Sequence, residues 1–160
     1  MKITKVEVLR VKTNRPSWRP IFCRIHTDEG IYGDGEAAMA YDAGAPAAYA
    51  MLKDLAPTLI GMDPMQIEWI WETFFRTPFW GLTAVPVMYS AMSAIDIALW
   101  DIKGKAYGRP LHEIFGGARR KDVRAYASQL QFGWSHTDLH VPQLKPEDYA
   151  NVAKKAVFEE

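Results

Sequence analysis

The segment from residue 91 to residue 106, AMSAIDIALWDIKGKA, constrains the fold more than any other part of the chain. At the helical repeat its apolar side chains fall on one stripe, formed by Met92, Ile95, Leu99, Ile102 and Ala106. A helix with one apolar stripe has to bury that stripe against another layer of structure. The sequence therefore predicts a long helix that packs on a sheet or on other helices.

The same helix carries charges, which are interpreted as structural. Asp101 and Lys105 are four residues apart with the acid first, which is the favourable order for a helical ion pair. Asp96 and Lys103 lie at the edge of the stripe. A divalent-metal site needs several convergent oxygens, and no second carboxylate or histidine shares the helical face of Asp96.

Three segments before this helix have the alternating pattern of strands. They span residues 2–12, 21–27 and 31–37, and they are joined by a Pro-containing loop at 13–20 and a short turn at 28–30. The alternation slips at Leu9, which suggests a β-bulge there. The pattern predicts a three-stranded antiparallel meander that ends in a GxGE turn from Gly33 to Glu36, followed by a loop at 38–44.

Further helices are expected around the long one. Residues 45–61 are rich in helix formers as far as Pro57. Asp63 is a candidate N-cap, with Pro64 at the first position of a helix over 64–76. A short helix within residues 109–117 is expected to end on glycine.

After Gly117 the pattern changes to a strand at 123–130, a loop at 130–145 and an amphipathic helix at 146–160. A strand, a loop and a helix are the beginning of a βα unit, which needs a second parallel strand. We therefore expect an α+β domain at residues 1–117 and, at 118–160, the start of a larger α/β domain that is incomplete in this chain.

Composition limits the function classes. Nineteen basic residues balance nineteen acidic ones without a run of like charge, which argues against a partner that is a nucleic acid or an anionic membrane. The single cysteine, Cys23, fits a reducing compartment. The charged start is unlike a signal peptide, and no apolar run reaches the ~20 residues of a membrane span. A soluble cytoplasmic protein is expected.

The motifs together resemble a known family. The GxGE run, the segment AIDIALWDIKGKAYGRPLHEIFGG and the strand-like VRAYAS occur in this order in the chain. They resemble the N-terminal capping domain of the enolase superfamily, in the branch of mandelate racemase and muconate-lactonizing enzyme. The resemblance covers essentially the whole chain. It implies an α+β cap, with a meander plus helices, that leads into the first βα unit of a modified TIM barrel.

The resemblance also implies a chemistry. Members of the family remove a proton α to a carboxylate and stabilise the resulting enediolate on Mg²⁺. In the family, the metal carboxylates and the catalytic lysines or histidines lie on later parts of the barrel. The expectation is therefore that residues 1–160 hold neither catalytic residues nor metal ligands, and that residues beyond Glu160 bind the Mg²⁺.

Two loops of the cap form the substrate lid in the family, and they match residues 13–20 and 38–44 here. The substrate contacts implied by this match are Arg15, Trp18, Arg19, Tyr41 and Asp42. The two arginines suit a carboxylate or hydroxyl groups, although they also fit the pattern of ordinary solvated loop arginines. The loop after the first barrel strand adds Trp134 and His136 as pocket-wall candidates, with a surface or interface loop as the alternative.

A lid with arginines and aromatic residues favours a polyhydroxylated acid as substrate. The resemblance thus implies a lyase, most simply an acid-sugar dehydratase that forms a 2-keto-3-deoxy acid, in a symmetric homo-oligomer. A racemase, epimerase or cycloisomerase of the same branch is one alternative. The other is a non-catalytic remnant of the cap that acts as a binding module.

Overall fold

A computed structural model of the chain describes residues 1–14, 17–79, 81–83, 85–126, 128 and 145–158. The chain divides into two compact units, Met1–Ala118 and Arg119–Glu160, and each is described by itself. None of the described helices is both long enough and apolar enough to cross a membrane.

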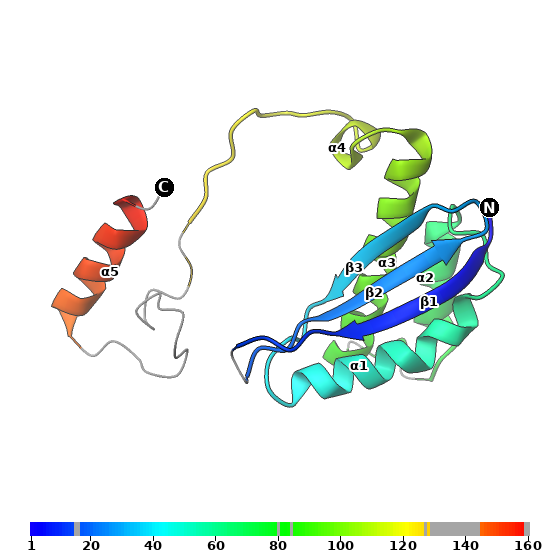
Figure 1. Cartoon of the computed structure of the whole chain (residues 1–160), viewed down its shortest axis with the longest axis horizontal. Coiled ribbons are helices and arrows are strands. Elements are labelled where there is room, and N and C mark those ends of the chain that lie inside the picture. Colours follow the sequence, from blue (N-terminus) through cyan, green and yellow to red (C-terminus); the bar gives the residue numbers. More distant parts are fainter. Residues whose placement is uncertain (15–16, 80, 84, 127, 129–144, 159–160) are drawn as a thin grey trace. The chain divides into compact units, whose positions relative to one another are not determined.

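The first unit is built on the predicted antiparallel meander, with strands β1 (Ile3–Arg10), β2 (Ile21–Thr27) and β3 (Tyr32–Ala37) in the order β1-β2-β3 (Figure 1). The bulge predicted at Leu9 is wrong, because Leu9 pairs in register with Phe22. The register shifts between Ile3 and Lys5 instead. The shift turns Ile3 towards the core, whereas strict alternation would place it on the same face as exposed Lys5.

Helices cover one face of this sheet (Figure 1). They are α1 (Gly44–Leu55), the 3₁₀ turn η1 (Ala56–Leu59), α2 (Ile67–Arg76) and the long α3 (Pro86–Tyr107). The predicted stripe of α3 is confirmed, since Met92, Ile95, Leu99 and Ile102 are buried. They pack in one cluster with the inward side chains of β2, which are Ile21, Cys23 and Ile25.

The GxGE run lies inside β3, so the predicted turn is wrong. Gly33 and Gly35 face α3, and a Cβ atom built on either would lie 2.0 Å from a backbone oxygen, of Ala98 and Ala94 respectively. The glycines therefore serve the close approach of strand and helix. Glu36 is exposed on the other face of the sheet and pairs in register with Phe22.

The helix predicted from Pro64 begins later, at Ile67 after the N-cap residue Gln66. Asp63 does not cap it. The Oδ1 atom of Asp63 accepts the N–H of Met65 at 3.0 Å, which closes a turn before the helix starts. The short helix predicted within 109–117 is confirmed as α4 (Leu111–Ile114).

In the second unit the predicted C-terminal helix is present as α5 (Pro146–Phe158). The strand expected at 123–130 is not formed by its described residues, 123–126 and 128. A parallel strand exists only through hydrogen bonds to neighbouring strands, and the described part of this unit contains none.

Candidate functional site

The two loops matched to the family lid leave the same end of the sheet (Figure 1). One connects β1 to β2, and the other connects β3 to α1. Because β1 and β3 both run antiparallel to β2, they are parallel to each other in direction, and their C-terminal ends lie at the same end of the sheet. The meander itself therefore brings the candidate substrate contacts of both loops into one region.

The loops are also joined by backbone hydrogen bonds. Trp18 and Tyr41 form an isolated antiparallel bridge. The Arg19 N–H donates to the Ala40 carbonyl at 2.7 Å, and the Asp42 N–H donates to the Ser17 carbonyl at 2.9 Å. We call residues 17–19 and 40–42 the loop ladder. Nothing in the apolar pattern of the sequence indicates it.

The structure thus brings four of the predicted site residues together: Trp18, Arg19, Tyr41 and Asp42. Trp18 is half-buried, whereas the side chains of Arg19, Tyr41 and Asp42 are exposed. The Thr13 hydroxyl donates to the Trp18 carbonyl at 2.6 Å and so holds the first loop from within. Three further predicted residues, Arg15, Trp134 and His136, lie outside the described part of the chain.

Ser90 is a functional candidate that sequence reasoning missed. It lies in the first turns of α3, is only 4% exposed, and its Oγ accepts the N–H of Met39 at 3.3 Å. The second loop is thereby tied to the helical layer. A small polar residue among buried apolar positions was the available signal, because a buried hydroxyl normally has a hydrogen-bond partner.

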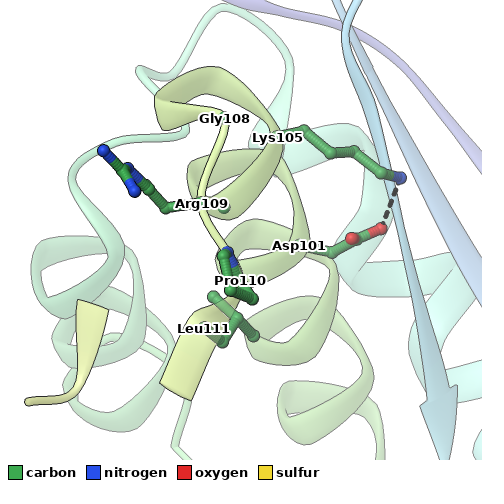
Figure 2. A pocket seen from close by; sticks show the side chains of 7 residues that line it. Asp101, Lys105, Gly108, Arg109, Pro110 and Leu111 are labelled. Carbon is green, nitrogen blue, oxygen red and sulfur yellow. Dashed lines mark hydrogen bonds and ion pairs between the residues drawn. The ribbon is translucent and has the colours of Figure 1, made fainter. Parts of the chain in front are cut away.

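A pocket of about 340 Å³ opens at the other end of α3 (Figure 2). Lys105 Nζ lies 2.6 Å from Asp101 Oδ2 and 2.8 Å from the Tyr32 carbonyl oxygen, and Asp101 Oδ2 accepts the Asp34 N–H at 3.0 Å. These bonds fasten α3 to β3. The interpretation of Asp101 and Lys105 as structural charges is confirmed.

Asp96 has a second carboxylate nearby after all. Burial raises the pKa of the half-buried Asp96 carboxyl above its ordinary value, and the Glu68 carboxylate, which comes from α2, raises it further. Sequence reasoning missed this neighbour because it lies on a different helix. No group of three or more metal-ligating side chains is present among the described residues, so they do not fit a Mg²⁺ site.

Charged pairs cover the outer face of the sheet. The Glu7 carboxylate lies 2.5 Å from Lys5 Nζ and 2.7 Å from His26 Nε2, and these hydrogen bonds, led by that of Lys5, lower the pKa of Glu7 to about 2. Arg24 Nε of β2 lies 2.7 Å from Asp34 Oδ1, on the residue of β3 that pairs with it in register. These groups are paired with one another within the sheet, away from the loop ladder.

Comparison with known proteins identifies the family. Residues 6–116 match the model of the mandelate racemase/muconate lactonizing enzyme N-terminal domain. A D-galactonate dehydratase of Pectobacterium atrosepticum is 41% identical over 127 residues, which are 79% of this chain and 31% of that protein. A D-mannonate dehydratase of Novosphingobium aromaticivorans is 38% identical over 122 residues, with 76% of this chain and 30% of that protein covered.

Solved structures agree in fold. A member of the enolase superfamily from Salmonella Typhimurium superposes with a TM-score of 0.89 at 50% identity and covers 99% of this chain and 40% of its own. An enolase from Pantoea ananatis with bound D-gluconate and Mg has a TM-score of 0.65 at 38% identity over 74% of this chain and 28% of its own. The chain spans about a third of the length of the two dehydratases named above, from Pectobacterium atrosepticum and Novosphingobium aromaticivorans. It belongs to the mandelate racemase/muconate lactonizing enzyme family of the enolase superfamily, and residues 6–116 are the N-terminal domain of that family.

Proposed function

We propose that this chain is the N-terminal part of an enzyme that dehydrates an acid sugar to a 2-keto-3-deoxy acid. The observation that carries the proposal is the similarity, at 38–41% identity, to relatives named D-galactonate and D-mannonate dehydratases. In such a reaction an α-proton is removed and the β-hydroxyl leaves. A racemase, epimerase or cycloisomerase of the same branch would share the first step only.

In this proposal the loop ladder is part of the substrate lid. Arg19 would donate hydrogen bonds to the carboxylate or hydroxyls of the sugar acid, together with Arg15. Trp18 and Tyr41 would cover the bound substrate and exclude water, as lids generally do. Residues 118–160 would begin the barrel, and Trp134 and His136 would line the pocket from its first loop.

The cofactor would be Mg²⁺, in line with the solved relative that holds D-gluconate and Mg. As the resemblance to the family implies, the metal would be held by residues beyond Glu160. A hard cation there would stabilise the negative charge that develops on the substrate carboxylate. The residues of this chain would act on substrate binding and access alone.

The test uses the full-length protein, purified and incubated with Mg²⁺ and a panel of sugar acids that includes D-galactonate, D-mannonate and D-gluconate. We expect a 2-keto-3-deoxy product from at least one of them, and loss of turnover after chelation with EDTA. Racemisation or epimerisation without loss of water would contradict the dehydratase assignment. An absence of any reaction, with retained binding of sugar acids, would favour the non-catalytic alternative.

The role of the lid is tested by Arg19→Gln in the same protein. Removal of the guanidinium is expected to raise KM by about tenfold or more, because a charge-assisted hydrogen bond to the substrate is lost. Lys2→Gln is the matched control, since Lys2 is an exposed cation at the opposite end of β1. Equal KM values for the two variants would remove Arg19 from the lid.

Homo-oligomerisation is part of the proposal as well. Apolar side chains that are large and exposed occur around α2 and α3, namely Trp69 (56% exposed), Phe79 (83%), Leu82 (59%) and Ile97 (48%). Surfaces of this kind commonly contact another protein surface. Light scattering of the full-length protein is expected to give a multiple of the monomer mass, and a monomer at all concentrations would contradict this part.

A further inference from the structure

The loop ladder contains one residue in an unusual backbone conformation. Asp42 has φ = 44°, and among the described residues it is the sole non-glycine with positive φ. This left-handed conformation costs energy for most residues, although aspartate and asparagine tolerate it best. A residue persists in such a conformation only where the surrounding structure holds it there, and such residues cluster at active sites and ligand-binding segments.

The conformation of Asp42 fits its place between two elements. Its N–H donates the hydrogen bond to Ser17 that closes one end of the ladder, and α1 begins two residues later at Gly44. The Gly44 N–H donates to the Tyr41 carbonyl at 3.0 Å. At Asp42 the chain therefore leaves the ladder and turns into the helix while it still holds the first loop.

The second loop is anchored on both sides of residues 40–42. On one side Met39 is bonded to buried Ser90 of α3, and on the other side the chain enters α1. The first loop is hydrogen-bonded to the second through the backbones of Arg19 and Asp42. Any displacement of one loop against the other has to break these two bonds.

We propose that Asp42 is a positioning residue whose left-handed backbone couples the two loops, so that Trp18 and Tyr41 are presented to the substrate as one pair. Asp42 then acts through its backbone, and its carboxylate has no direct contact with the substrate. The consequence for substrate binding rests on the proposed function. The coupling itself belongs to this chain and is measurable without substrate.

Amide hydrogen exchange of the 160-residue chain tests the coupling. Asp42→Val places a β-branched side chain in the left-handed region, and it is expected to speed exchange at the Arg19 amide, in the other loop, by about tenfold. Asp42→Asn tolerates the conformation and should leave that rate within about twofold. Unchanged exchange at Ile25, in the centre of the sheet, shows that the variants are folded.

Faster exchange at residue 42 of Asp42→Val with an unchanged rate at Arg19 would overturn the proposal, because the loops would then open independently. If Asp42→Val does not fold, the same exchange measurement is made on the variant Ser90→Ala. This variant is expected to fold, because alanine is favourable within a helix. Loss of the Ser90 hydroxyl should speed exchange at Met39 and at Arg19 by similar factors. A change confined to Met39 would equally overturn the coupling.

Kinetics of the full-length enzyme separate a backbone role from a side-chain role. Asp42→Val is expected to raise KM by about tenfold with kcat within about twofold, and Asp42→Asn is expected to recover most of that loss. A defect in Asp42→Asn as large as that in Asp42→Val would assign the carboxylate to direct substrate contact and overturn the positioning role. If the enzyme turns over no sugar acid, the proposed function fails, and the exchange experiment still decides the coupling.

Discussion

Gly35 brings the backbone of β3 against the backbone of α3. With Gly33 it replaces the side-chain layer that normally separates a strand from a helix, since a Cβ atom at either position would overlap a helix carbonyl. The sequence showed two conspicuous glycines, but a turn and a close backbone approach both call for glycine. Only the position of α3, which is distant in sequence, shows that the glycines serve a close backbone approach and not a turn.

Gly35→Ala is therefore expected to destabilise the first unit by about 2–4 kcal/mol, because the backbones have to move apart. The measurement is urea denaturation followed by tryptophan fluorescence. Glu36→Ala is the control on the exposed face of the same strand, and it should cost less than about 0.5 kcal/mol. A cost at Gly35 as small as that at Glu36 would mean that strand and helix are not in backbone contact.

Glu7 gives the molecule part of its acid sensitivity. Its pKa is about 2 in the folded state against an ordinary 4.5, so the folded chain binds fewer protons there than the unfolded chain. The stabilisation is present above about pH 4.5 and is lost as the pH falls through about 2. Glu7→Gln should flatten the fall of unfolding free energy over this range. An unchanged slope in Glu7→Gln would contradict the pairing with Lys5 and His26.

At the scale of elements, apolar periodicity was enough to predict the three strands, α3 and α5, and the glycines at 116–117 indicated the end of α4. It was not enough for boundaries that depend on local hydrogen bonds, as the start of α2 shows, because Asp63 has the same chemistry as an N-cap or as a turn residue. The loop residues Trp18 and Tyr41 came from the family resemblance alone. The ladder between them consists of backbone bonds, which leave no signature in side-chain pattern.

The end of α3 also depends on local hydrogen bonds. Gly108 has φ = 60°, its N–H donates to Lys105, and the Arg109 N–H donates to the Gly104 carbonyl, which together form a Schellman cap. Gly108→Ala should lower the free energy of unfolding by about 1–2 kcal/mol, and Gly108→Asn by less, since asparagine tolerates this conformation. Equal losses in a thermal or urea titration would exclude the left-handed cap.

On the scale of the molecule, the buried apolar cluster formed by the described residues lies between Ile3 and Ile102, within the first unit. The apolar stripe within residues 91–106 was enough to predict the contribution of the long helix to this core. The domain boundary placed after Gly117, where the pattern changes, stays a prediction. The strand predicted at 123–130 depends on neighbours that are distant in space. A pattern within one segment has no information on whether those neighbours are present.

A chain that ends at Ala118 is therefore expected to unfold cooperatively at nearly the same temperature as the 160-residue chain, measured by circular dichroism. A chain that ends at Tyr107 should melt lower, because it loses the Gly108 cap and the contact of Trp100 with Phe115, whose ring centroids are 4.6 Å apart. A large fall in melting temperature on removal of residues 119–160 would contradict this expectation, because it would show that the first unit depends on the second for its stability.

At Gly33 and Gly35 the contact of β3 with α3 is made by main-chain atoms. The second loop begins at the end of β3, and the first loop begins at the end of β1. We expect replacement of loop side chains to leave the contact between β3 and α3 unchanged, because Gly33 and Gly35 lie outside both loops. Side chains in these two segments can therefore be exchanged without a change in the contact of β3 with α3, as long as the position of Asp42 keeps a residue that tolerates positive φ. Grafting residues 13–20 and 38–44 from a relative of different specificity is the corresponding route for engineering.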